Sequence, residues 1–206
     1  MAARDKVVSR APRARFHFLP HHLCHAASAF FASPFEAAAV LIIDGIGEFN
    51  STWLGLGQGN RLTELEVVGY PHSLGFVWER MSEFLGFDIY SGPGKVMGYA
   101  ALTDPIGELT GADFLSRMRT ILHEESGGTF RVDGEAFRFR TDDFSGLERL
   151  FGPRRVAVVD RYEDASVAAA LQAVTQDIMV HLARRLYERV NAGRKDLDVE
   201  GGSSLI

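Results

Sequence analysis

The sequence is poor in cysteine and has no long apolar run. Its one cysteine, Cys24, cannot form a disulfide framework, and no segment approaches the ~18 apolar residues that a membrane span needs. The basic start MAARDKVVSRAPRARF also lacks the apolar core of a secretory signal. We therefore expect a cytoplasmic protein that does not enter a membrane. An excess of positive charge is absent too, since the net charge is -5, and this argues against a nucleic-acid partner.

The composition that remains is typical of a globular protein. Hydrophobic residues make up 46% of the chain and charged residues 24%, and 206 residues suffice for one substantial core. The first 15 residues are basic and lack apolar periodicity, so we interpret 1–15 as a disordered lead-in. Residues 16–206 are then the folded part.

Apolar periodicity predicts strands and helices after this lead-in. The predicted elements are a short strand at 15–20, a helix at 21–31, a strand at 37–45 whose apolar run is typical of burial on both faces, and a hairpin at 51–57 and 61–70. Next come a helix at 73–86, a glycine-rich loop at 91–101 entering a short helix, and an insertion or subdomain at 105–155 with a helix at 112–124, a hairpin at 130–139 and a helix at 142–151. One long helix begins near Asp164 and runs to Val190, and a strand at 196–202 precedes four residues of another helix. Because four residues cannot cover a sheet, we expect a truncated chain.

Three histidines lie within five residues at the start of the first predicted helix. His21 and His25 are four residues apart and share a helix face, so two ring nitrogens can reach one ion, while His22 points away. Asp44, at the tip of the following strand, is the natural third ligand. Two imidazoles and one carboxylate suit a transition metal and leave open positions for a substrate. The alternative is that this spacing marks only the solvated start of a surface helix.

A glycine-rich turn follows Asp44. Gly45 and Gly47, with Ser51 and Thr52 just beyond them, form a strand-to-turn segment whose free amides favour an anion such as phosphate. The alternative reading of this segment is an ordinary hairpin turn.

Other candidate residues are scattered along the chain. Lys95 offers a point charge to a phosphate, although its segment lacks the GxxxxGK[ST] frame and is otherwise a connector. Gly201 and Gly202 allow the close approach of a nucleotide or merely form a tight corner. Asp164 is either an active-site carboxylate or a helix N-cap. Cys24 is more simply a packing residue than a nucleophile.

Five segments taken in order resemble the NodU/CmcH-type O-carbamoyltransferases over residues 17–206: HHLCHAASAF, LIIDGIGEFNST, PHSLGFVWERMSEFLGF, GKVMGYA and VEGGSSL. The resemblance implies an α/β chain that is part of an actin/Hsp70-type ATPase fold, with a mixed sheet and flanking helices, related to the tRNA threonylcarbamoyl transferases. It implies the central part of the core domain, truncated at both ends and without the adenylate-forming domain. In such proteins that domain makes carbamoyl-adenylate from carbamoyl phosphate and ATP, and the core domain passes the carbamoyl group to a substrate hydroxyl.

The resemblance also assigns roles to residues. It implies that His21, His25 and Asp44 bind a divalent metal, typically Fe2+, with Zn2+ or Mn2+ as alternatives. The transfer also needs a carboxylate that draws off the proton of the acceptor hydroxyl, and our own candidate for it is Asp164. The implied nucleotide contacts are Gly45, Gly47, Gly201 and Gly202. The chain departs from the family at SGPGKVMG, where an acidic residue usually precedes KVMG, and at GGSSLI, where a GGVALN-like run is usual, so nucleotide contacts there are altered.

The implied partners are a small hydroxylated acceptor, carbamoyl phosphate and ATP, and a homo-oligomer is allowed. We expect the isolated chain not to turn over efficiently. Three other functions stay open. A tRNA threonylcarbamoyl transferase would be favoured by a basic RNA-binding face, and a non-catalytic module would bind nucleotide or a partner chain through its unfinished sheet. A zinc hydrolase is the third, but the chain lacks the glutamate of HExxH.

Overall fold

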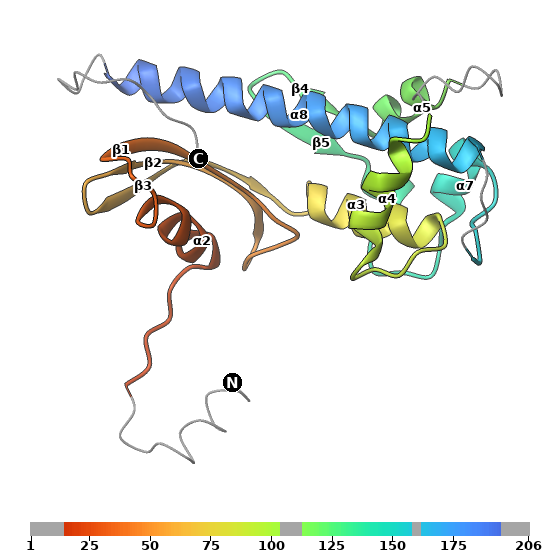
Figure 1. The fold of residues 1–206 in the computed structure, drawn as a ribbon, viewed down its shortest axis with the longest axis horizontal. Coiled ribbons are helices and arrows are strands. Elements are labelled where there is room, and N and C mark those ends of the chain that lie inside the picture. The colour runs from red at the N-terminus through yellow and green to blue at the C-terminus, as the bar shows by residue number, and fades with distance from the viewer. Residues whose placement is uncertain (1–14, 104–112, 158–161, 195–206) are drawn as a thin grey trace.

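The computed structural model describes residues 15–103, 113–157 and 162–194 (Figure 1). The predicted strand at 196–202 lies outside these residues, as does the predicted lead-in apart from residue 15. The elements are α2 (His21–Phe30), β1 (Ala37–Ile43), β2 (Asn50–Gln58), β3 (Arg61–Gly69), α3 (Leu74–Phe84), α4 (Gly92–Ala100), α5 (Phe114–Ile121), β4 (Leu122–Glu125), β5 (Thr129–Val132), α6 (Gly134–Phe137), α7 (Ser145–Phe151) and α8 (Tyr162–Arg194).

The described chain contains both helices and strands, as predicted, but these occur in runs, and every hydrogen-bonded pair of described strands is antiparallel. β1, β2 and β3 form a three-stranded sheet in that order, and β4 and β5 form a separate pair. The strands follow one another through short reversals, such as the turn at Gly59 with φ +57°, and such connections give antiparallel neighbours. The described strands therefore do not form the mixed sheet that we expected.

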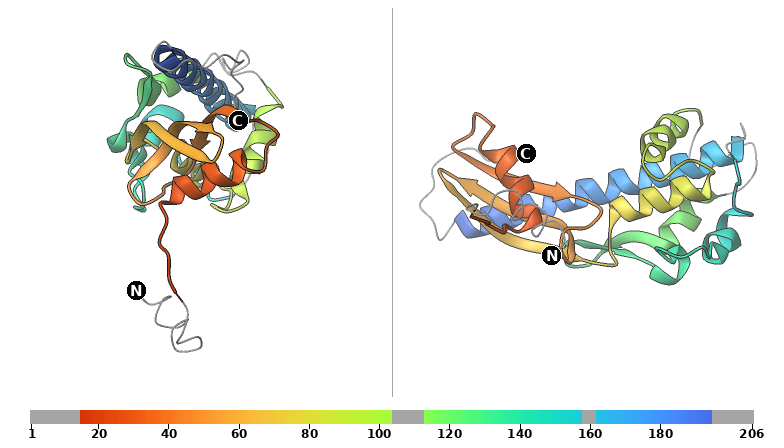
Figure 2. Two further views of the ribbon diagram at one scale, coloured as in Figure 1. Left: turned by 90° about the vertical axis from the view of Figure 1, so that its left-hand side faces the viewer. Right: turned by 90° about the horizontal axis from the view of Figure 1, so that it is seen from below.

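Two helices cover opposite faces of the three-stranded sheet. Figures 1 and 2 show α2 on one side of the sheet and α8 on the other. On β1, Ala38 and Val40 pack with Phe30 of α2, whereas Ala39 packs into the core that α8 shares. The apolar run of β1 was predicted to be buried on both faces, and this alternation confirms it.

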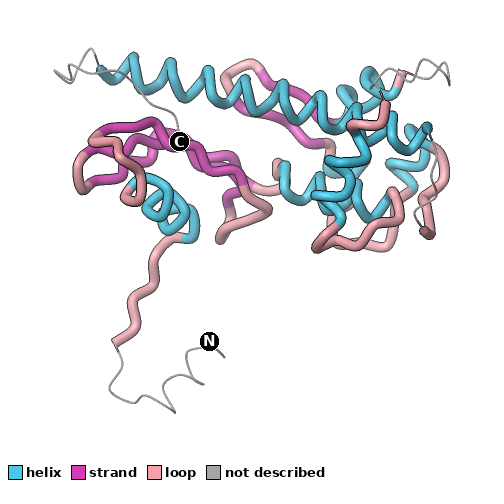
Figure 3. Tube along the Cα trace, in the orientation of Figure 1, coloured by secondary structure: helices cyan, strands magenta, loops and turns pink. Residues whose placement is uncertain are grey.

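Helix α8 forms one side of the larger core along most of the molecule. Its 33 residues extend about 50 Å and pack against α4, α5, β4 and β1. Leu171, Val174, Ile178 and Leu182 are buried, as their spacing of three and four residues predicted. Figure 3 shows the three-stranded sheet beneath one half of α8 and the shorter helices around the other half. No helix in the described ranges is both long and apolar enough to cross a membrane.

Two short predictions near the site were wrong. Residues 15–20 form no strand, because they pair with none of the described strands, and Phe18 is 81% exposed. The glycine-rich segment after Ser91 is helical from its start, since α4 begins at Gly92. Pro93 lies in the first turn of α4, where a proline loses no hydrogen bond.

The middle region pairs differently from the prediction. Helix α5 ends at Ile121, and the chain continues directly as β4, which pairs with β5. The second strand expected near 135–139 is instead the short helix α6. Asp133 caps α6 by accepting hydrogen bonds from the backbone N–H groups of Glu135 and Ala136. An N-capping aspartate therefore converts the expected hairpin turn into a helix start.

Candidate functional site

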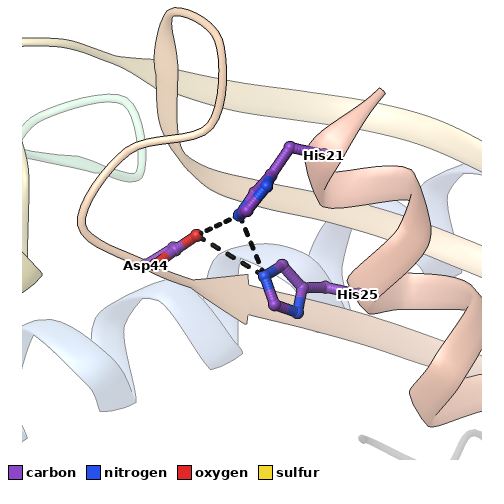
Figure 4. A group of neighbouring side chains, drawn as sticks. All are labelled: His21, His25 and Asp44. Atoms are coloured by element: carbon purple, nitrogen blue, oxygen red, sulfur yellow. Dashed lines mark hydrogen bonds and ion pairs between the residues drawn. The ribbon is translucent and has the colours of Figure 1, made fainter. Parts of the chain in front are cut away.

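Helix α2 presents His21 and His25 to the tip of β1 (Figure 4). The helix begins after Pro20, without a side-chain cap of its own. Glu48, from the loop after β1, accepts a hydrogen bond from the backbone N–H of His21 at 3.0 Å, so it satisfies one of the free donors of the first turn. Phe30 is buried against the sheet, and this packing holds the histidine-bearing side of α2 toward the loop.

Asp44 directly follows β1 and is fixed through its backbone and one carboxylate oxygen. Its backbone N–H donates to the Ser51 carbonyl at 2.8 Å, and Oδ1 accepts from the Gly45 N–H at 2.6 Å. Oδ2 is turned toward α2, 2.7 Å from His21 Nε2 and 3.6 Å from His25 Nε2. The two Nε2 atoms are 3.0 Å apart.

These three atoms fit the ligand set of a transition metal. They all lie within 4.8 Å of one another. Ligand atoms held ~2.0–2.2 Å from one ion at tetrahedral or octahedral angles are separated by roughly 3 Å to 3.5 Å, which is close to the observed spacing. The side chains of His21, His25 and Asp44 are 45%, 50% and 31% exposed, so further ligands have access from one side.

The electrostatics of the site favour an ionised carboxylate. Burial alone would raise the pKa of Asp44, but the hydrogen bond from Gly45 and the interactions with His21 and His25 together lower it below the ordinary value. A carboxylate must be deprotonated to bind a metal, so this shift prepares Asp44 for that role.

His22 is buried beside the two exposed histidines. Burial lowers its pKa and so favours the neutral imidazole. Its Nε2 atom lies 3.9 Å from Asp44 Oδ2 and has no hydrogen-bond partner among the described residues. His22 therefore packs behind the site and does not share the exposed face of His21 and His25.

Glycines allow the tip of β1 to lie between α2 and α3. A Cβ atom on Gly47 would lie 2.9 Å from Cε1 of His22, which is too close, and 3.3 Å from Cβ of His21, which is tight. On the other side, a Cβ on Gly75 of α3 would lie 2.6 Å from the backbone nitrogen of Gly45. Ser73 adds a hydrogen bond from its hydroxyl to the Gly45 carbonyl at 2.6 Å. The position of Asp44 thus depends on close backbone packing from both sides.

Asp44 also lines an open cavity of about 520 Å³, to which α3, α4, α8 and the tip of β1 contribute. Its walls are mostly apolar and include Trp78, Tyr90, Met97 and Met179. A small molecule in this cavity would therefore lie directly beside one of the three candidate ligands.

Among the described residues, the side chains of Ser51, Thr52 and Lys95 do not join the cluster of His21, His25 and Asp44. Ser51 is fully buried, and its hydroxyl donates to the carbonyls of His72 and Val68. Thr52 is also fully buried. Lys95 forms an exposed ion pair with Asp88 at 3.4 Å. The predicted contacts Gly201 and Gly202 lie outside the described residues, and the nucleotide roles of all these residues stay predictions.

Asp164 lies in the first turn of α8, which Figure 1 places beside α7 and away from α2. Its side chain is buried, and Oδ1 accepts from Arg155 Nε at 2.6 Å. The carboxylate thus has a partner in the core, and its position in a first turn also suits the helix dipole. Its role as a proton acceptor stays a prediction.

Sequence reasoning missed three residues around the site. Glu48 lies four residues after Asp44 and has no motif of its own. Glu79, which lines the cavity, occurs in a helix where a carboxylate is ordinary. Burial of His22 follows from its place on the same helix face as Ala26, and that spacing was the one available signal.

Comparison with known proteins identifies the family. The family described as "Carbamoyltransferase N-terminus" matches residues 2–205. The uncharacterized protein sll1178 of Synechocystis is 37% identical over 193 residues, which are 91% of this chain and 30% of that protein. The nodulation protein NolNO of Sinorhizobium fredii is 31% identical over 189 residues, covering 91% of this chain and 25% of its own length. The nodulation protein NolO of Bradyrhizobium diazoefficiens is 31% identical over 186 residues, which cover 88% of this chain and 30% of NolO.

The chain therefore belongs to the carbamoyltransferase family and corresponds to its N-terminal part, which confirms the resemblance to the NodU/CmcH type. It spans 25–30% of the length of these relatives.

Proposed function

We propose that this chain carries the metal-binding part of an O-carbamoyl transfer site, in which His21, His25 and Asp44 bind a divalent cation, most simply Fe2+. The carbamoyl group would come from carbamoyl-adenylate, made from carbamoyl phosphate and ATP, and would pass to a hydroxyl of a small acceptor. The observation that carries this proposal is the convergence of three ligand atoms within 4.8 Å, in a chain whose family is named for carbamoyl transfer.

The residues around the site each support this role. The Gly45 N–H holds Oδ1 of Asp44, which leaves Oδ2 turned toward α2. Glu48 fixes the first turn of α2, so the two imidazoles keep their direction. The cavity beside Asp44 gives an acceptor hydroxyl a place next to these ligands. When bound, the cation would supply positive charge for carbonyl or phosphate oxygens, as a Lewis acid does.

The direct test is an anaerobic calorimetric titration of the chain with Fe2+, repeated with Zn2+ and Mn2+. We expect one site per chain. Replacing a ligand, as in His21→Ala or Asp44→Asn, should weaken binding by more than the ~10- to 100-fold that loss of an outer-shell partner costs.

His17→Ala is the matched control, because His17 is exposed, lies four residues before His21 and forms no part of the cluster. The control should bind metal as the unchanged chain does. Equal losses in His17→Ala and His21→Ala, or no binding by the unchanged chain, would contradict the proposal.

A further inference from the structure

The cavity beside Asp44 combines apolar and acidic side chains in its lining. Its lining is largely apolar, with Trp78, Tyr90, Met97 and Met179 contributing side chains. The charged residues among its described lining are both acidic, Asp44 and Glu79. No lysine, arginine or histidine of the described lining offsets them. The cavity therefore has an apolar body, and Glu79 is the carboxylate of its described lining that stays negative when Asp44 binds a cation.

Glu79 is the carboxylate of this cavity to which neither the fold nor the proposed metal site assigns a role. It lies on α3, half-buried, and accepts no hydrogen bond or ion pair from the described residues. Glu79 also lines an adjoining hollow with Arg140, whose guanidinium lies over the Phe76 ring, 5.1 Å from the ring centre. Burial, together with the Asp44 carboxylate, raises the pKa of Glu79 against the opposing charge of Arg140. A carboxylate in this situation is stabilised by a donor that the protein itself does not supply.

Glu79 also lies close to the tip of β1. Its Oε1 atom would be 3.9 Å from a Cβ atom built on Gly45, the residue next to Asp44. One small molecule can therefore contact both acidic residues of the cavity. Such a molecule would place one polar group at Asp44 and another at Glu79, with its apolar part against the aromatic and methionine side chains.

We propose that this cavity binds the acceptor of the transfer reaction, and that the acceptor is a small hydroxylated ammonium compound with an apolar face. Its ammonium group donates to Glu79, and its hydroxyl is directed toward Asp44. This inference rests on the proposed function for the identity of the ligand as the acceptor. Glu79 acts here as a specificity-determining residue, because it favours a cationic acceptor over a neutral or anionic one.

The test compares three cyclohexanes of one shape, in which the two substituents lie on opposite ring carbons and are trans to each other. They are aminocyclohexanol, cyclohexanediol and hydroxycyclohexanecarboxylate. Binding is followed by NMR of the full 206-residue chain with labelled methionine methyl groups. Met97 and Met179 line the cavity, whereas Met118 is fully buried and not in its lining. We expect the Met97 and Met179 signals to shift and the Met118 signal to stay unchanged. The amine should bind about tenfold more tightly than the diol.

Two variants decide the role of Glu79. Glu79→Gln should reduce the affinity for the amine to that for the diol, and an unchanged Met118 signal shows that the variant is folded. Glu36→Gln removes the same charge at an exposed position outside the cavity and should keep the preference. The inference is overturned if the three compounds bind equally, if none shifts the cavity methionines, or if the preference survives in Glu79→Gln.

This readout is separate from metal binding and from turnover. If the chain prefers the amine but binds no metal at His21, His25 and Asp44, the cation-selective cavity is supported and the proposed transfer function is contradicted. If the chain binds metal but shows no preference for the amine, the proposed function is supported and the cationic acceptor is contradicted.

Discussion

Gly47 shows how a residue without a side chain determines the position of the candidate ligands. A Cβ atom there would press on the His22 ring, 2.9 Å from its Cε1 atom, and would lie 3.3 Å from Cβ of His21. We predict that Gly47→Ala shifts α2 and lowers metal affinity by about 10- to 100-fold, as changes beside a ligand often do. Competition with a coloured chelator measures this change.

Gly98→Ala is the matched control for this prediction. Gly98 lies within α4, and a Cβ atom there meets nothing within 4 Å. Alanine should stabilise that helix by up to about 1 kcal/mol and leave metal affinity unchanged. If both glycine variants bind metal normally, close packing at Gly47 does not position the ligands.

Asp143 gives a pH-dependent test at the scale of one residue. The backbone N–H of Ser145 donates to its carboxylate at 2.8 Å, and this bond, with Arg138 nearby, lowers the pKa of Asp143 from 3.8 to about 2. A carboxylate whose pKa is lowered by folding stabilises the folded state above its ordinary pKa, and this contribution is lost as the pH falls toward the folded value. We predict that Asp143→Asn lowers the free energy of unfolding at pH 7 and that its effect disappears between about pH 4 and pH 2.

Urea unfolding at a series of pH values measures this difference. Asp142→Asn removes a neighbouring charge that accepts no hydrogen bond from the described residues, and it should show no such profile. A constant difference between Asp143→Asn and the unchanged chain across the acid range would refute the prediction.

The candidate ligands could be predicted from the sequence because their spacing indicates which way the side chains point. Residues four apart lie on one helix face, and the end of an apolar strand is where a carboxylate meets solvent, so His21, His25 and Asp44 could be grouped in advance. The surroundings could not be predicted. Glu48 and Glu79 reach the site through tertiary packing, and no local pattern marks which surface carboxylate will lie near a given loop.

At the scale of elements, one hydrogen bond connects α3 to α8 beneath the cavity. The indole N–H of Trp78 donates to the Thr175 hydroxyl at 3.1 Å, and both side chains are buried. We predict that Thr175→Val costs about 1–3 kcal/mol of unfolding free energy, because the indole N–H is then buried without a partner. Thermal or urea unfolding measures the loss.

A double-mutant cycle separates this bond from general packing. Trp78→Phe removes the donor, so adding Thr175→Val to it should cost less than the single Thr175→Val change. Thr120→Val removes an exposed hydroxyl from α5 and should change stability by less than about 0.5 kcal/mol. Additive losses in the cycle would show that the hydrogen bond contributes nothing specific.

Elements with a strong apolar period were predictable, and elements decided by pairing were not. The spacing of α8 and the alternation of β1 follow from burial of one helix stripe and of two strand faces. The composition of residues 15–20 predicted a strand, yet a strand requires a neighbour, and no described strand pairs with them. The middle region was misread because the partner of β5 is the short β4, which continues directly from a helix, and not the segment after it.

At the scale of the whole molecule, the candidate site depends on a small core that is separate from the large one. Phe30, Ala38, Val40 and Trp53 belong to the core under α2, while α8 organises the other. Phe30 lies directly against Gly57, where a Cβ atom would come within 2.5 Å of its ring. We predict that Phe30→Ala undocks α2 and weakens metal binding, while the α8 core stays folded.

Amide hydrogen exchange and metal titration together test this separation. Phe30→Ala should lose protection in α2 but keep it in α8, since regions of a protein can open independently. Phe31→Ala removes the same side chain at a 53% exposed neighbouring position and should change neither readout. Loss of protection throughout the chain in Phe30→Ala would mean that the two cores unfold as one.

The arrangement of ligands on two elements has a further consequence for α2. An ion held by His21 and Asp44 would join positions 23 residues apart, and so would act as a removable crosslink between a helix and a strand. Closing a loop in this way restricts the unfolded chain, much as a disulfide does, and this chain has one cysteine. The attachment of α2 would then tighten or loosen with the supply of metal around the protein, because a ligand that binds the folded form stabilises it by mass action.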